Sequence, residues 1–212
     1  MPEPFYFHSE LHLVKLLGIK AGNPAELLNH IREVPPSSIY YHTHRFLQQH
    51  HYLSPEPPND FAYWVTNILA LDALGERLAS VDFVHFSEID DLRNEFIGIL
   101  TDYIERGKYC VDCEPGEDFH FMSCVSVVLP TPYVAHTLQD FLEIIPKLSI
   151  NSLYFHVFEA RLRLKNSGND FSRWFRDMGQ EKLAEKLSRV DPYTITLEGL
   201  REKIMKTVST YV

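Results

Sequence analysis

The sequence predicts a mainly α-helical fold made of two copies of one unit, each copy holding about five helices. The first observation is that the chain matches itself when shifted by 114 residues, and the matched pairs include Phe5 with Phe119, Tyr40 with Tyr154 and His42 with His156. The second is an Asn-Asp-Phe-x-x-Trp motif at residues 59–64 that returns at residues 169–174 and uses both tryptophans of the chain. The third is apolar residues at helical spacing behind capping residues in both copies.

We therefore interpret the chain as a first repeat over residues 3–106, a linker over 107–116 and a second repeat over 117–212. Matches that stay in order at a fixed shift are the signature of a repeated structural unit. We expect the two repeats to pack as one globular unit with an approximate two-fold arrangement.

Both repeats open with alternating residues, and this alternation favours extended backbone over helix. The segments are Phe5-Tyr6-Phe7 and Phe119-His120-Phe121, and Val125–Leu129 is also rich in β-branched residues. We expect a short strand or hairpin at the start of each repeat.

The first two helices of each repeat are predicted from their caps. Asn23 followed by Pro24 is typical of a helix start, and Thr137 followed by Asp140 replaces it in the second repeat. Ser38 and Ser152 are expected to cap the second helices, which the apolar spacing places at 39–49 and 153–164.

The remaining helices follow the same logic. Asp60 and Asp170 are expected to cap the third helix, whose first turns put an aromatic pair on one face. Ser87 to Asp90 forms a predicted capping box for the fifth helix of the first repeat. The fourth and fifth helices are expected at 72–81, 89–106, 180–190 and 197–212.

Composition and charge narrow the functional class. The net charge of −9 argues against nucleic-acid binding, which needs clustered Lys and Arg. No apolar run is long enough to span a membrane, and the first residues lack the pattern of a secretory signal. Three cysteines cannot all pair within one chain, which fits a reducing cytoplasm. We expect a cytoplasmic protein with no membrane or nucleic-acid partner.

Two histidines are the main polar residues that both repeats keep. His42 and His156 each follow a kept tyrosine by two positions, Tyr40 and Tyr154. One interpretation is a core histidine bonded to a backbone carbonyl near a helix start. The other makes these four residues the polar lining of a ligand site on the surface between the repeats, because a buried phenol also needs a partner.

The second repeat also offers a candidate anion site. Up to residue 106 there are 7 basic and 15 acidic residues, whereas the rest of the chain has 13 and 14. Arg161 and Arg173 are the candidate ligand-binding residues of the second repeat, for a small anionic ligand. The competing interpretation is a solvated helix face with Glu159 and Arg163 as an ion pair one turn apart.

A weaker pattern, a group of possible zinc ligands, lies in and just after the linker. Four potential metal ligands fall within fifteen residues, namely Cys110, Cys113, His120 and Cys124. Their spacing matches no specific zinc module, so unligated thiols and a redox Cys-x-x-Cys remain alternatives.

No motif of nucleophilic catalysis, phosphate-binding loop or dinucleotide fingerprint occurs. We therefore expect a non-enzymatic small-ligand-binding, partner-binding or regulatory protein. The alternative is a metal-dependent, hydrolytic enzyme that uses the histidine-rich first repeat, where eight of the 11 histidines lie. A third interpretation is an assembly protein whose acidic first half meets a basic protein partner.

The repeated motifs also carry a resemblance. The segments 37–42, 152–163 and 169–174, with their Ser-[Ile/Leu]-Tyr-[Tyr/Phe]-His and Asn-Asp-Phe-x-x-Trp patterns, resemble an uncharacterised prokaryotic family of unknown function. The resemblance covers nearly the whole chain. It implies a cytoplasmic prokaryotic protein and brings no catalytic residues with it.

Overall fold

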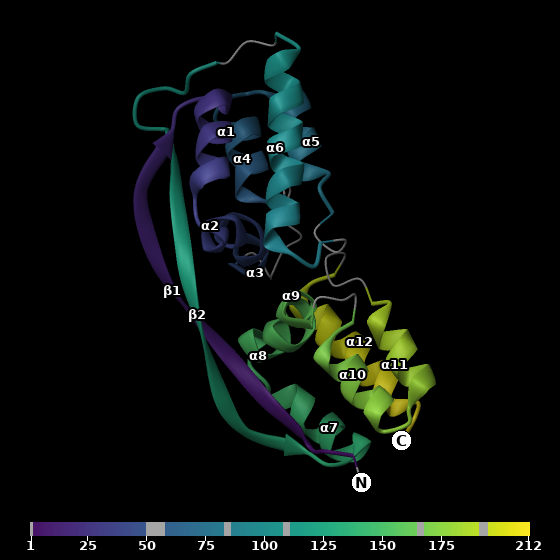
Figure 1. Cartoon of the computed structure of the whole chain (residues 1–212). Helices are drawn as coiled ribbons and strands as arrows, with labels where there is room; N and C mark the ends of the chain where they lie inside the picture. The colour runs from purple at the N-terminus through teal and green to yellow at the C-terminus, as the bar shows by residue number, and fades with distance from the viewer. Residues whose placement is uncertain (1, 50–57, 83–85, 108–110, 165–167, 191–194) are drawn as a thin grey trace. The chain divides into compact units, whose positions relative to one another are not determined.

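The chain is mainly helical, with one two-stranded antiparallel sheet (Figure 1). This computed structural model describes residues 2–49, 58–82, 86–107, 111–164, 168–190 and 195–212. The sheet pairs β1 (Phe5–Ala21) with β2 (Phe119–Ala135). No described helix is both long enough and apolar enough to cross a membrane.

The chain divides into two compact units whose boundaries differ from those of the expected repeats. Among the described residues, the α1–α6 unit comprises 13–49, 58–82, 86–107 and 111–125, and the α7–α12 unit comprises 2–12, 126–164, 168–190 and 195–212. Each unit therefore contains the first residues of a strand that the sequence assigns to the other repeat. The two repeats over residues 3–106 and 117–212 remain a prediction from the sequence.

The α1–α6 unit contains helices from the first half of the chain and the start of β2. Its elements are α1 (Pro24–Glu33), α2 (Pro36–Tyr40), the π-helical η1 (Tyr41–Arg45), α3 (Phe46–Gln49), α4 (Asp60–Asn67), α5 (Asp72–Ala79) and α6 (Ile89–Glu105). Phe119 and Phe121 of β2 enter its core, where the Phe119 ring lies 5.3 Å from the Phe61 ring, centroid to centroid. Burying such rings provides the main driving force for folding.

The α7–α12 unit is built in the same way around the start of β1. Its elements are α7 (Leu138–Ile144), the 3₁₀ turn η3 (Ile145–Lys147), α8 (Ile150–Tyr154), the π-helical η4 (Phe155–Glu159), α9 (Ala160–Leu164), α10 (Asp170–Asp177), α11 (Glu181–Ser188) and α12 (Leu197–Ser209). Phe5 and Phe7 belong to its hydrophobic core. The Phe5 and Phe171 ring centroids lie 5.4 Å apart.

The helix starts confirm some predicted caps and correct others. Asn23 caps α1, and Thr137 with Asp140 forms a complete capping box on α7. The predicted box at Ser87 to Asp90 is wrong, since Glu88 is the residue before α6 and no side chain caps it.

The expected serine caps of the second helices are also wrong. Those helices begin earlier, at Pro36 and Ile150, so Ser38 and Ser152 lie inside them. Ser152 is buried and donates its hydroxyl to the His8 carbonyl at 2.6 Å, while Ser149 caps the helix in its place.

Asparagine, not aspartate, caps the third helix in both units. Asn59 and Asn169 accept the capping hydrogen bonds, and Asp60 and Asp170 are the first helical residues. The physical reason is that each asparagine is buried and has a second role. Its amide group also donates to a backbone carbonyl about 18 residues further on, and a carboxylate cannot donate in this way.

The short strands of the sequence analysis are in fact 17 residues long each. The first three residues of each strand alternate between buried and exposed, as at Phe5 to Phe7, and the sequence pattern detects this part together with Val125–Leu129 of β2. Their middle residues, such as Leu13 and Leu16, are exposed apolar residues without alternation. Pairing between β1 and β2 extends them, and this long-range pairing leaves no local signal.

Candidate functional site

The two kept histidines lie in matching π-helical segments. His42 is the second residue of η1 and His156 is the second residue of η4. A π-helical turn inserts an extra residue into the helix and redirects the side chains that follow, and such turns often occur at functional sites. Both histidines are buried, with 1% and 2% of their surface exposed.

In the α1–α6 unit, both ring nitrogens of His42 make hydrogen bonds. The Met122 backbone N–H of β2 donates to Nε2 at 2.9 Å, so Nε2 carries no proton. The ring is therefore the neutral Nδ1–H tautomer, and Nδ1–H donates to the Asp60 carboxylate at 2.6 Å. His42 thereby joins the start of α4 to β2.

His156 makes the same pair of bonds in the α7–α12 unit. The His8 backbone N–H of β1 donates to Nε2 at 2.8 Å, and Nδ1–H donates to Asp170 at 2.8 Å. Burial lowers the pKa of His156 below its ordinary value and outweighs the opposing effect of Asp170. Both histidines are therefore buried and hydrogen-bonded, as the first interpretation expects, but the backbone carbonyl expected as the partner is wrong: the partners are a carboxylate and a backbone N–H.

The two tyrosines belong to the packing of the same helices. The Tyr40 ring stacks on the His44 ring at 5.6 Å between centroids, and the Tyr154 ring stacks on the Phe158 ring at 4.5 Å. Tyr154 and Phe158 are members of the hydrophobic core of their unit. Burial lowers the pKa of His44 to about 4.

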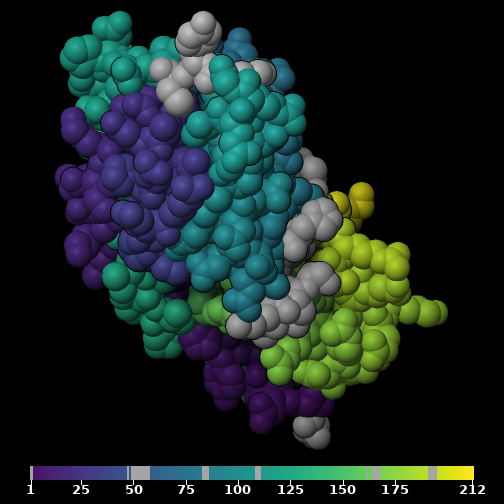
Figure 2. All heavy atoms as spheres, turned by 45° about the horizontal axis from the view of Figure 1, so that its top comes forward, coloured from purple at the N-terminus to yellow at the C-terminus, as the bar shows by residue number. Residues whose placement is uncertain are grey.

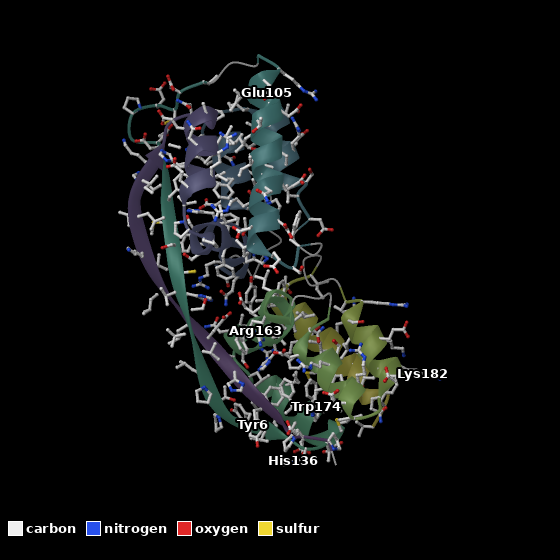
Figure 3. All side chains as sticks on the ribbon, in the orientation of Figure 1. Tyr6, Glu105, His136, Arg163, Trp174 and Lys182 are labelled. Carbon is white, nitrogen blue, oxygen red and sulfur yellow. The ribbon has the colours of Figure 1, made fainter. Side chains whose placement is uncertain are left out.

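His156 also lines a cavity of about 610 Å³ that lies within the α7–α12 unit. We call it the β1–α10 cavity. Its walls come from residues 3–6 and 8, from Val128 of β2, from η4 and α9, and from α10. Figure 3 labels three of the residues that line it, namely Tyr6, Arg163 and Trp174.

The start of the chain forms one wall of this cavity because it is tied to α10. The indole N–H of Trp174 donates to the Glu3 carbonyl at 2.9 Å. In the space-filling view, the first residues of the chain (purple) lie against the yellow-green residues of α10 and α11 (Figure 2). The cavity therefore depends on residues about 170 positions apart in the sequence.

Arg163 is held in a defined position at the cavity wall. Its Nη2 donates to the Asp170 carboxylate at 2.7 Å and to the Phe155 carbonyl at 3.1 Å. Its guanidinium carbon lies 4.0 Å from the centroid of the Phe155 ring, a cation–π contact. The guanidinium is thus fixed before any ligand arrives, and 37% of the side chain is exposed.

Asp170 connects Arg163 to His156, since one carboxylate oxygen accepts from both. Burial by itself raises the pKa of Asp170, but the hydrogen bonds from His156 and Arg163 outweigh burial and the pKa is lowered. Asp170 is therefore an anion at neutral pH, and Arg163 balances its charge.

Arg173 is the second guanidinium of the cavity and differs from Arg163 in its surroundings. It is exposed on α10, and within the described residues it makes no hydrogen bond or ion pair. Glu3 and Asp177 are acidic residues of the same cavity wall.

Two of the predicted candidates, His156 and Arg173, line the cavity, whereas the Arg161 side chain lies outside the described residues. The other lining residues were not proposed as site residues from the sequence, and they include His8, Phe155 and Arg163. The competing expectation of an Arg163–Glu159 pair is wrong, because Arg163 pairs with Asp170. The expected site between the two repeats stays a prediction, and the cavity found lies within one unit.

The candidate zinc ligands do not gather in the part of the chain that the structure describes. No group of three His, Cys, Asp or Glu side chains there is arranged to hold a metal ion. His120 is exposed on β2, Cys113 is half-buried and Cys124 is buried. Cys110, His50 and His51 fall outside the described residues.

Comparison with known proteins gives a family and a fold. The model of the Family of unknown function (DUF5752) matches residues 2–209. The chain is similar to the solved structure of OrfY from Thermoproteus tenax, with 29% sequence identity and a TM-score of 0.82. That match covers 98% of this chain and 95% of that chain. No curated protein matches the chain.

Proposed function

The chain belongs to a family of unknown function, which supplies no activity, and from the geometry above we propose that it is a non-enzymatic protein that binds a small anionic ligand in the β1–α10 cavity. The observation that carries this proposal is the fixed guanidinium of Arg163 at the wall of a cavity that His156 and Arg173 also line. A volume of about 610 Å³ lies in the range typical of small-molecule sites, roughly 300–1,000 Å³.

The unused donors of the two arginines support an anion as the ligand. The hydrogen bonds of Arg163 to described residues all use Nη2, which leaves Nε and Nη1 as donors. Arg173 has all of its donors left within the described residues. A guanidinium fork matches the oxygens of a carboxylate or phosphate, and one held in place loses little entropy on binding.

The charge balance of the cavity indicates how the ligand would bind. Asp170 neutralises Arg163 in the absence of ligand, whereas Arg173 stands near Glu3 and Asp177 without pairing with them. An anion bound at both arginines would share Arg163 with Asp170. We therefore expect moderate affinity that weakens as salt is added.

We also propose that the two units arose by an internal duplication, and that only the second copy has the two arginines of the cavity. The same hydrogen bonds recur in both units: those of His42 and His156, of Asn59 and Asn169, of Trp64 and Trp174, and of Arg93 and Arg201. The histidine pair is aligned by a shift of 114 residues, and the asparagine and tryptophan pairs by a shift of 110. At these two shifts, Gln49 replaces Arg163 and Tyr63 replaces Arg173. The common framework would then be inherited, and the anion site would be particular to the second copy of a cytoplasmic prokaryotic protein.

The test measures thermal unfolding in the presence of sulfate, phosphate or malonate, against chloride at equal ionic strength. A ligand at 100 times its Kd stabilises by about 2.7 kcal/mol, which raises the Tm of a chain this size by about 5–10 °C. Arg173→Tyr, the residue at the equivalent position of the other unit, should abolish this increase.

Arg176→Tyr is the matched control, because Arg176 lies on the same helix, is exposed, and is not among the residues that line the cavity. It should leave the Tm increase intact. Equal responses in the wild type and in Arg173→Tyr would refute the proposal, as would the absence of any increase with the three anions.

A further inference from the structure

His8 and Tyr6 are the titratable side chains of the β1–α10 cavity wall that the proposed function does not use, and the backbone of His8 is held on both sides. Its N–H donates to His156 at 2.8 Å and its carbonyl accepts from Ser152 at 2.6 Å. Because side chains alternate along a strand, burying Phe7 turns His8 away from the core. The imidazole of His8 is therefore presented to the cavity from a fixed backbone.

One ring nitrogen of His8 is already in use. Nδ1 lies 3.0 Å from the Tyr6 carbonyl oxygen, and a carbonyl can only accept, so Nδ1 carries the proton. In the neutral ring, Nε2 is then a lone-pair acceptor at the cavity. Such an acceptor repels the oxygen of an anion, and it becomes a donor only when it takes up a proton.

The charged groups around His8 come from every element that lines the cavity. Arg163 and Asp170 form an ion pair, and His156 is held neutral by its two hydrogen bonds. The other charged residues of the cavity wall are Glu3, Arg173 and Asp177. In the absence of ligand, the formal charge of these groups is −1 with His8 neutral, so a proton on His8 makes the cavity neutral.

We propose that His8 is a third anchor of the ligand site and that the ligand is an oxyacid dianion bound together with a proton taken up at Nε2 of His8. This inference rests on the proposed function. With this proton, two guanidinium groups and an imidazolium provide three charged donor groups for the oxygens of a dianion, and the cavity no longer carries a net negative charge that would repel it. A monoanion would be held by the arginines alone and would need no proton.

The position of His8 relative to Arg163 supports a shared ligand. The His8 ring centroid lies 6.2 Å from that of Phe155, and the same Phe155 ring holds the Arg163 guanidinium at 4.0 Å. Both groups thus contact one aromatic ring. In the other unit the residue aligned with His8 is Met122, which cannot take up a proton.

The experiment is isothermal titration of the full chain with sulfate, which stays doubly charged between pH 5.5 and 8. The protons taken up are measured by repeating the titration in two buffers of different ionisation enthalpy. We expect an uptake of about half a proton per sulfate near neutral pH, the amount that a tenfold coupling between proton and sulfate allows. The affinity should then fall about tenfold between pH 6 and pH 8, because proton and sulfate each favour binding of the other.

His8→Met, the residue found in the other unit, is the matched variant. The hydrogen bonds of residue 8 to His156 and Ser152 both use its backbone, so we expect the variant to fold. Circular dichroism checks this. It should bind sulfate about tenfold more weakly at pH 6 and show no pH dependence. His136→Met, at an exposed position of the same unit that is not among the cavity's lining residues, should behave like the wild type.

A direct measurement on the unmodified protein complements the variants. The pKa of His8, followed by NMR, should rise by about one unit at saturating sulfate. If sulfate binding depends on Arg173 but takes up no proton and leaves the pKa of His8 unchanged, His8 is no anchor and only this inference fails. If sulfate does not bind at all, both the inference and the proposed function fail.

Discussion

The stacked pair of Tyr40 and His44 makes the stability of the α1–α6 unit dependent on pH. His44 is buried with 3% of its surface exposed, and burial lowers its pKa to about 4 from an ordinary value of 6.5. The unfolded chain takes up a proton at His44 as the pH falls through 6.5, whereas the folded chain does not until about pH 4. The stability contributed by neutral His44 is therefore complete above pH 6.5 and is lost between pH 6.5 and pH 4.

The size of the effect follows from the difference between the two pKa values. One pKa unit corresponds to 1.36 kcal/mol, so the loss of unfolding free energy is about 3 kcal/mol by pH 4. His44→Phe removes this dependence, and the substitution has a precedent at the aligned position, where Phe158 stacks on Tyr154 in the same way. We expect the variant to retain about 3 kcal/mol more of its neutral-pH stability than the wild type at pH 4.

The assay is urea unfolding between pH 4 and pH 8, followed by tryptophan fluorescence. Each unit holds one tryptophan, so a Trp174→Phe background leaves Trp64 as the reporter of the α1–α6 unit. The difference between the two proteins isolates the contribution of residue 44. Parallel stability curves for the two proteins, within about 0.5 kcal/mol at every pH, would refute the reasoning.

Two further predictions concern stability alone. Arg201→Met should lower the unfolding free energy, measured by urea unfolding, by about 2–4 kcal/mol. The reason is that Arg201 donates two buried hydrogen bonds to backbone carbonyls, at 2.6 and 2.9 Å. A decrease of less than about 1 kcal/mol would contradict this. Gly75→Ala should lower the Tm, because the new Cβ would lie 1.9 Å from Thr66 Oγ1. Gly98→Ala should raise the Tm or leave it unchanged, because its new Cβ would have no neighbour within 4 Å. Equal Tm changes in the two alanine variants would show that packing at Gly75 is not limiting.

Local patterns of the sequence predicted local structure well. Asn23 and Thr137 cap helices as expected, because the capping residue and the amide it accepts from are three positions apart. Asp60 failed as a cap because the choice between it and Asn59 depends on the Leu78 carbonyl, which only the folded unit brings close. Distant partners leave no mark in the local pattern.

The same distinction holds for the candidate site. His156 and Arg173 could be picked out, one because its position is kept in both halves of the chain and the other by its charge. His8 and Arg163 could not, since the cavity joins residues 3–8 to helices about 150 positions later, and no spacing rule connects them. The alternation of Phe5, Tyr6 and Phe7 did signal a strand, and the polar side of that strand is the wall that was missed.

The exchange of strand ends between the two units has a consequence for the order of folding during synthesis. The α1–α6 unit lacks part of its core until Phe119 and Phe121 have left the ribosome, well after its last helix is made. The α7–α12 unit needs Phe5 and Phe7, which are made long before the helices of that unit. Contacts across such long stretches of chain slow folding. Neither unit can reach its native core while the chain is half made, so the newly made N-terminal strand is exposed for most of translation.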